Sequence, residues 1–172
     1  MPGAGKSTIA DGLKLRGYKI INMGNAVRAE AKKRNLEPNG ENLGKIMLEL
    51  REQNGPSAVA QLIEPEINES SSNIIVIDGI RSNDEIQFLK KIGTVKILSI
   101  HASTDTRFHH LTKRGRSDDP QNKENFAKRD TRELDVGIST SIALADESIS
   151  NNNLTIEQLV NLAFTIIEDW AK

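Results

Sequence analysis

The residues at the start of the chain have the types and spacing of a phosphate-binding loop. Gly5, Lys6 and Ser7 match the second glycine, the lysine and the hydroxyl of the pattern G-x-x-x-x-G-K-[ST]. Glycines let the backbone N–H groups turn toward a polyphosphate, the lysine reaches the β- and γ-phosphates, and the hydroxyl ligates Mg²⁺. We expect a nucleoside triphosphate to be bound by Pro2, Gly3, Ala4, Gly5, Lys6, Ser7 and Thr8. The alternative is a glycine-rich chain end before an amphipathic helix.

A second candidate is Asp78, which ends the most apolar run of the chain, Ile74–Ile77. In a parallel sheet, ligands gather beyond the carboxyl ends of the strands, so this carboxylate is expected near Lys6 and Ser7. We predict that Asp78 holds Mg²⁺ together with Ser7 or accepts a proton from the substrate. The alternative is a strand-end aspartate that caps the following turn.

Arginine is the third residue type in this pattern. Arg28 and Arg81 are predicted at loop ends on the same edge of the sheet, where a planar guanidinium fork suits a phosphate group. Further arginines lie close together in the sequence: Arg107, Arg114, Arg116, Arg129 and Arg132. Phosphoryl transfer is catalysed mainly by positioning and charge neutralisation, which is a role that arginines can fill. The alternative is a set of solvated, charged helix faces.

Strands and helices alternate along the chain. Apolar residues at helical spacing predict helices over residues 6–16, 25–34, 42–53, 57–68, 84–91, 104–113 and 123–134, and a last helix from Thr155. Short apolar runs predict strands over residues 18–22, 73–78, 95–100 and 146–150. The run at 73–78 lacks polar alternation, as is typical of a parallel strand covered on both faces. The chain is therefore predicted to be an α/β protein, a three-layer α/β/α fold with a mainly parallel sheet.

The last helix has a particularly clear pattern. Thr155 and Gln158 have the spacing of a capping box at its start. Apolar residues then recur at helical spacing, and those predicted to be buried are Ile156, Leu159, Val160, Ala163, Ile167 and Trp170.

The beginning of the chain leaves the phosphate-binding pattern incomplete. The first glycine of the pattern falls one place before Met1, and the strand that leads into such a loop is missing from the sequence. We expect this strand to belong in the middle of the sheet, flanked by the strands near residues 18 and 74. Its loss would leave backbone groups unpaired. The pattern favours a misassigned start or a truncated chain over a loop without its strand.

Bulk composition argues against several kinds of partner. The 23 Lys and Arg residues nearly balance 24 Asp and Glu, so no basic field favours nucleic-acid or membrane-surface binding. With four Phe, one Tyr and one Trp, a base-stacking platform is not expected. No apolar run approaches the roughly 20 residues needed to span a bilayer. We expect a cytoplasmic protein that binds neither nucleic acid nor membranes.

Together these motifs resemble those of P-loop nucleotide kinases such as adenylate kinase and dephospho-CoA kinase, and more closely an archaeal branch of that group. Gly24-Asn25-Ala26-Val27-Arg28 resembles the Gly-Asp-x-x-Arg of adenylate kinases, and Asp78-Gly79-Ile80-Arg81 resembles their Asp-Gly-x-Pro-Arg. Arg116-Ser117-Asp118-Asp119, with Arg129, resembles the lid whose arginines close over the transferring phosphoryl group. The segment 145–153 resembles the loop that meets the adenine of ATP.

The resemblance implies an ATP- and Mg²⁺-dependent phosphotransferase with a nucleotide or nucleotide-like acceptor, such as a nucleoside monophosphate or dephospho-CoA. It implies catalytic roles for Lys6, Asp78, Arg116 and Arg129, a nucleotide contact for Arg114, and acceptor binding by Gly24, Arg28 and Arg81. It also implies one domain over residues 1–172, with acceptor-binding helices at about 25–68 and a short lid at about 114–132. Asn25 replaces an aspartate of the family pattern and no proline precedes Arg81, so the identity of the acceptor stays open.

A different hypothesis is an NTP-hydrolysing regulatory protein, in which the lid senses the γ-phosphate instead of assisting transfer. A simple switch of this kind has no need of an acceptor-phosphate pair such as Arg28 and Arg81.

Overall fold

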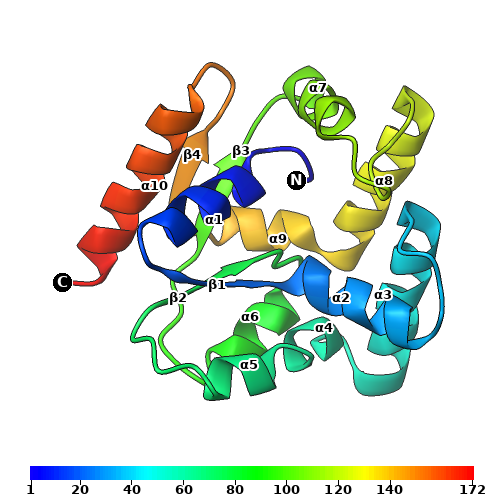
Figure 1. Cartoon of the computed structure of the whole chain (residues 1–172), viewed down its shortest axis with the longest axis horizontal. Coiled ribbons are helices and arrows are strands. Elements are labelled where there is room, and N and C mark those ends of the chain that lie inside the picture. Colours follow the sequence, from blue (N-terminus) through cyan, green and yellow to red (C-terminus); the bar gives the residue numbers. More distant parts are fainter.

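The computed structural model describes residues 1–172 and places four short strands among ten helices (Figure 1). The strands are β1 (Lys19–Asn22), β2 (Ile75–Asp78), β3 (Leu98–His101) and β4 (Glu147–Ser150). The helices are α1 (Lys6–Leu15), α2 (Met23–Lys33), α3 (Gly40–Asn54), α4 (Ala58–Gln61), α5 (Glu64–Asn68), α6 (Asn83–Leu89), α7 (Thr104–Arg114), α8 (Lys123–Val136), α9 (Ile138–Ala143) and α10 (Ile156–Trp170). None of the helices is long and apolar enough to cross a membrane.

The strands form two separate parallel pairs. Strand β1 pairs with β2 in a register that sets Asn22 opposite Asp78, and β3 pairs with β4 so that His101 lies opposite Ser150. No strand pairing joins one sheet to the other. The expectation that a further strand would lie between those near residues 18 and 74 is therefore wrong. These two strands bond directly to each other, and neither of them pairs with β3 or β4.

Apolar clusters cover both faces of the first pair, as the sequence predicted for β2. Ile75 and Ile77 pack on a cluster built mainly from α2, α3, α4 and α6, in which Ile46 and Ile63 are among the most deeply buried side chains. Val76, on the opposite face, packs on a second cluster, which is formed by Ala4, Ile9, Leu13, Ile100, Ala102, Ile149, Leu159 and Ala163. The second cluster also contains residues of β3 and β4, so it joins the two sheets and gives the predicted three layers.

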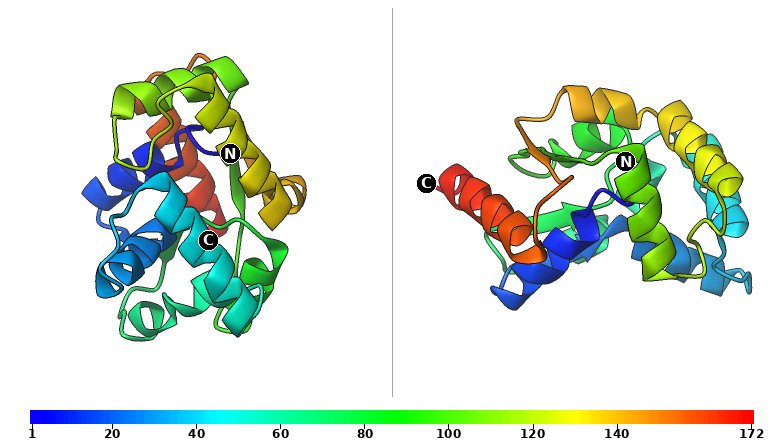
Figure 2. Two further views of the ribbon diagram at one scale, coloured as in Figure 1. Left: turned by 90° about the vertical axis from the view of Figure 1, so that its right-hand side faces the viewer. Right: turned by 90° about the horizontal axis from the view of Figure 1, so that it is seen from above.

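Figure 2 shows how the helices divide around these strands. Helices α1 and α10 lie side by side at one end of the molecule, and α2, α3, α7 and α8 gather at the other end. The phosphate-binding loop (P-loop, residues 2–8) lies between these two groups of helices (Figures 1 and 2).

Local capping decides several helix ends. The Asn22 side chain accepts a hydrogen bond from the Asn25 amide, so α2 begins at Met23, two residues before the predicted start. Thr155 and Gln158 form the predicted capping box of α10. Ile156, however, is 71% exposed in the first turn, which contradicts its predicted burial, whereas Leu159, Val160 and Ala163 are buried.

The predicted helix over residues 57–68 is two short helices in the structure. Helix α4 ends at Gln61, and α5 begins at Glu64 with Pro65 in its first turn. Proline cannot donate to a preceding carbonyl and is tolerated only in a first turn, so Pro65 forces a new helix start. Helix α9, between α8 and β4, was not predicted.

The crossing of α1 and α10 depends on a glycine. A Cβ atom at Gly12 would lie 2.6 Å from both Cγ atoms of Val160. We predict that Gly12→Ala destabilises the fold by about 2 kcal/mol, because the overlap outweighs the ~1 kcal/mol gained in helix propensity. Urea unfolding followed by circular dichroism measures the change. In a Val160→Ala background the same substitution should be neutral or stabilising, and an equal loss in both backgrounds would contradict the packing argument.

Candidate functional site

The P-loop adopts a backbone that only glycine accommodates easily. Gly3 and Gly5 have φ values of 80° and 110°. A Cβ atom at Gly3 would lie 2.5 Å from the carbonyl oxygen of Arg107, and one at Gly5 would lie 2.6 Å from the side-chain nitrogen of Asn151. Helix α1 begins directly after Gly5, and no side chain caps its first turn. The first N–H groups of the helix are therefore available to an anion.

The P-loop hydroxyl meets the strand-end aspartate. Ser7 Oγ donates to Asp78 Oδ2 at 3.3 Å, and Asn22 Nδ2 donates to the same oxygen at 2.7 Å. Asn22 is the register partner of Asp78, so parallel pairing of β1 with β2 delivers both side chains to one edge. A hydroxyl and a carboxylate are hard oxygen donors of the kind that Mg²⁺ takes, with phosphate and water oxygens completing its shell. The structure contains no group of three or more His, Cys, Asp or Glu that could hold a metal by itself.

Lys6 lies beside this pair. Its Nζ donates to the carbonyl oxygen of Met1 at 2.9 Å, and part of its side chain faces the pocket. Enclosure by the protein lowers the pKa of Lys6, while the charge of Asp78 acts in the opposite direction. The ammonium is therefore poorly solvated and would gain from a bound polyanion.

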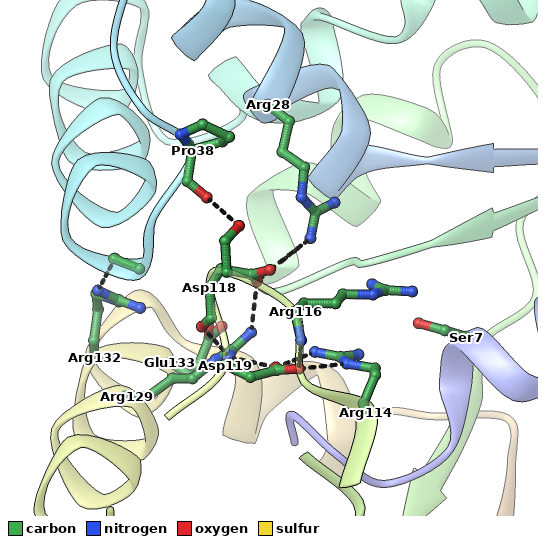
Figure 3. A network of polar contacts seen from close by, with 12 residues as sticks. Ser7, Arg28, Pro38, Arg114, Arg116, Asp118, Asp119, Arg129, Arg132 and Glu133 are labelled. Atoms are coloured by element: carbon green, nitrogen blue, oxygen red, sulfur yellow. Dashed lines mark hydrogen bonds and ion pairs between the residues drawn. The ribbon is translucent and has the colours of Figure 1, made fainter. Parts of the chain in front are cut away.

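The predicted lid segment, at about 114–132, is organised around two neighbouring carboxylates. Asp119 accepts from Arg114 Nε at 2.9 Å, from the Arg116 backbone N–H at 2.9 Å and from Arg129 at 3.3 Å. Asp118 accepts from Arg28 at 3.2 Å and from Arg129 at 3.4 Å. These contacts are drawn in Figure 3.

Arg116 differs from the other arginines of the lid. Its side chain is exposed, has no hydrogen bond or ion pair, and extends toward Ser7 (Figure 3). It is therefore an unpaired cation between the lid and the P-loop.

Arg81 is held at both of its ends by buried acids. Its amide donates to Glu85 Oε2 at 2.8 Å, and its guanidinium forms an ion pair with Glu133 on α8. Arg51 binds the other oxygen of Glu85 at 2.6 Å. Glu85 and Glu133 are 0% and 1% exposed, so the charge of Arg81 is neutralised inside the protein.

Thirteen of the fourteen predicted site residues line one pocket of about 530 Å³: Pro2, Gly3, Gly5, Lys6, Ser7, Thr8, Gly24, Arg28, Asp78, Arg81, Arg114, Arg116 and Arg129. Ala4 is fully buried below the loop instead, and its carbonyl accepts from Asn151 Nδ2 at 2.9 Å. Lysine and arginine side chains outnumber carboxylates in the lining of this pocket. Its chemistry is therefore that of a site for multiply charged anions.

Several residues at this site were not predicted. Arg107, for which the sequence left a solvated helix face open, is 5% exposed and donates to both oxygens of Asp130 at 2.9 and 2.6 Å. It also donates to the Pro2 carbonyl at 3.2 Å, so it ties the P-loop to α8. His110 Nδ1 lies 2.9 Å from the Gly3 carbonyl. The sequence carried a partial signal for Arg107, which lies in the arginine cluster, and for Asn151, which lies in the segment that resembles the adenine loop. Their contacts with the P-loop could not be predicted, because each joins segments more than 100 residues apart.

Arg132 does not reach the pocket. It donates to the Gly40 carbonyl at 3.1 Å and packs closely over Gly44, so it connects α8 to α3.

The glycine loop, its lysine and hydroxyl, and the aspartate at the end of β2 together define a P-loop protein with a kinase-like fold. The AAA domain family matches residues 1–127. The chain is 39% identical over 158 residues to a UPF0200 protein of Hyperthermus butylicus, covering 92% of this chain and 84% of that relative. It is 39% identical over 178 residues to a UPF0200 protein of Pyrococcus horikoshii, covering 99% and 96% of the two chains. The chain therefore belongs to the UPF0200 family of AAA-domain P-loop proteins.

Solved structures of kinases share this fold. A shikimate kinase from Bacteroides thetaiotaomicron superposes with a TM-score of 0.65 at 17% identity, covering 96% of this chain and 93% of that one. A sugar kinase from Janibacter superposes with a TM-score of 0.56 at 16% identity, covering 96% and 89%. At these identities the likeness is one of fold alone.

Asp119 should stabilise the lid in a pH-dependent way. Burial alone would raise the pKa of Asp119, but the hydrogen bonds from Arg114 and the Arg116 amide, with the charges of Arg114 and Arg129, lower it overall. The carboxylate therefore stabilises the fold above its unfolded pKa near 4, and this contribution disappears as the pH falls through the lower folded value. We predict that Asp119→Asn destabilises the protein by about 2 kcal/mol at pH 7.

Thermal unfolding between pH 7 and pH 3 measures this effect. The gap in stability between wild type and Asp119→Asn should narrow toward the acid end. Asp135→Asn, an exposed change on α8, is the matched control and should leave the profile unchanged. A gap that stays constant with pH would contradict the ionic role of Asp119.

Proposed function

We propose that this protein is an ATP- and Mg²⁺-dependent phosphotransferase that acts on a nucleotide or nucleotide-like acceptor, such as a nucleoside monophosphate or dephospho-CoA. One observation carries the proposal. The Ser7–Asp78 pair and Lys6 lie in the same pocket as Arg28 and Arg81, which come from other elements and have no part in the P-loop. A donor half and an acceptor half thus share one site.

In the donor half, the P-loop amides and Lys6 bind the phosphates of ATP, and Arg114 adds a further contact. Ser7 and Asp78 hold Mg²⁺, which when bound neutralises charge on the phosphates. Asn22 donates to Asp78 Oδ2 and so orients the carboxylate. The charge that develops in transfer is balanced by Arg116 and Arg129.

In the acceptor half, Gly24 gives α2 a close approach to the pocket, and Arg28 and Arg81 bind the anionic end of the acceptor. Arg28 is steadied by Asn25 Oδ1 at 3.0 Å, so the asparagine that replaces the family aspartate still orients this arginine. Glu85 and Glu133 hold Arg81 without the proline of the family pattern.

The single domain, the acceptor helices at about 25–68 and the lid at about 114–132 are parts of the same proposal. The kinase-like fold supports a small-molecule acceptor over nucleic acid or a membrane. Since its donor is ATP, we place the enzyme in the cytoplasm.

Purified protein with ATP and Mg²⁺ should release ADP in response to an acceptor. A panel of nucleoside monophosphates and dephospho-CoA, followed by coupled ADP detection and ³¹P NMR of the product, tests this prediction. Slow ADP release that is the same with every acceptor would overturn the kinase proposal. Partner capture that depends on ATP would then favour the NTP-hydrolysing switch.

Two substitutions should separate binding from transfer. Lys6→Ala should weaken ATP binding and reduce turnover, since the phosphates lose their only P-loop cation. Arg116→Ala should leave ATP affinity within about twofold while lowering kcat roughly 10³-fold, because an unpaired arginine acts mainly on the transition state. Lys123→Ala, an exposed change at the start of α8, is the control. A loss of ATP affinity in Arg116→Ala, with kcat unchanged, would contradict its assignment.

A further inference from the structure

The Asp118 carboxylate lies between two arginines of different elements. Arg28 on α2 approaches its two oxygens at 3.2 and 3.3 Å, and Arg129 on α8 approaches one of them at 3.4 Å. Only 8% of the Asp118 side chain is exposed, against 27% for Arg28 and 12% for Arg129. Figure 3 shows the carboxylate reaching from the lid toward α2. An arginine assigned to the acceptor is thus already occupied by an anion.

The neighbouring Asp119 provides a contrast within the same segment. All of its partners, Arg114, Arg116 and Arg129, belong to the lid and α8, so Asp119 maintains the shape of the lid. Asp118 is the acid that crosses to the acceptor side.

Two hydrogen bonds to backbone carbonyls also cross between the lid region and the acceptor side. Ser117 Oγ donates to the Pro38 carbonyl at 3.1 Å, and Arg132 donates to the Gly40 carbonyl at 3.1 Å. The lid can therefore stay docked on α3 and its preceding loop when Asp118 loses its partners.

We propose that Arg129 joins Arg28 and Arg81 in binding the terminal anionic group of the acceptor, a phosphate or a carboxylate. Arg28 and Arg129 form a subsite for this group, and Asp118 fills the subsite until the acceptor displaces it. The inference rests on the proposed function and deepens it. A guanidinium fork that holds one carboxylate has the geometry for a second planar or tetrahedral oxyanion. Arg116 is unpaired and faces Ser7, so its charge is available to the phosphates of the donor.

Displacement makes Asp118 a determinant of specificity. A phosphate dianion brings more charge than the carboxylate that it replaces, whereas a ligand with a neutral end leaves Asp118 in place. Asp118 leaves the subsite free in only a fraction of the protein molecules. The measured affinity for an anion is therefore lower than the intrinsic affinity of the free subsite by that fraction.

Anion binding to the isolated protein tests the proposal without turnover. The probes are inorganic phosphate and AMP, titrated by calorimetry at low ionic strength. Asp118→Asn removes the competing charge and keeps the side-chain shape, and it should tighten phosphate binding about tenfold. In the Arg28→Gln background the same substitution should have no effect.

Ser117→Ala is the matched control, because it removes the adjacent lid contact and leaves the Asp118 charge in place. Equal tightening by Ser117→Ala would show that lid opening, and not competition, governs the subsite, and it would overturn the proposal. Unchanged or weaker phosphate binding by Asp118→Asn would also overturn it. If Asp118→Asn does not fold, Asp118→Ser serves the same comparison.

These outcomes are distinct from failure of the kinase proposal. If no acceptor stimulates ADP release and phosphate binding still tightens in Asp118→Asn, the subsite stands and the phosphotransferase function fails. If transfer occurs and phosphate binding does not tighten, the function stands and the role of Asp118 fails.

Discussion

Mutual repulsion among arginines is the constraint on which this structure depends. The pocket collects Arg28, Arg81, Arg114 and Arg129 beside the P-loop lysine. At an effective dielectric constant of about 20, each unbalanced pair of neighbouring cations costs on the order of 3 kcal/mol. The chain balances them with carboxylates buried beside them: Asp118, Asp119 and Glu133. A site built to attract a polyanion is thereby kept stable before one binds.

The same ion pairs decide how the elements around the pocket are connected. Glu133 brings α8 to the loop after β2, and Arg107 joins the P-loop to α8 through Pro2 and Asp130. The P-loop, α2, α8 and the loop after β2 thus share one electrostatic network. In the proposed kinase, an acceptor that replaces one carboxylate of this network would change the electrostatic energy of the remaining ion pairs, and acceptor binding would in this way affect the lid segment.

Local sequence patterns predicted the helices and strands well wherever one segment determines its own structure. The apolar run before Asp78 forms β2, and the Thr155–Gln158 capping box starts α10. Predictions failed where a neighbour decides the outcome. Ile156 has helical spacing but lies in the first turn of α10, outside the face that packs on α1. The order of the strands was also predicted wrongly, because the sequences of two short apolar strands do not specify which strand each of them pairs with.

The candidate site divides in the same way. The sequence by itself determined the chemistry of the P-loop, since glycine, lysine and hydroxyl act within a single turn, and it determined that Asp78 ends a strand at the binding edge. Only the tertiary structure decided which acid neutralises each arginine. Arg28 and Asp118 are 90 residues apart, and Arg81 and Glu133 are 52 apart. Such pairs depend on how α2, the lid and α8 pack together, and no periodicity or spacing along the chain encodes that packing.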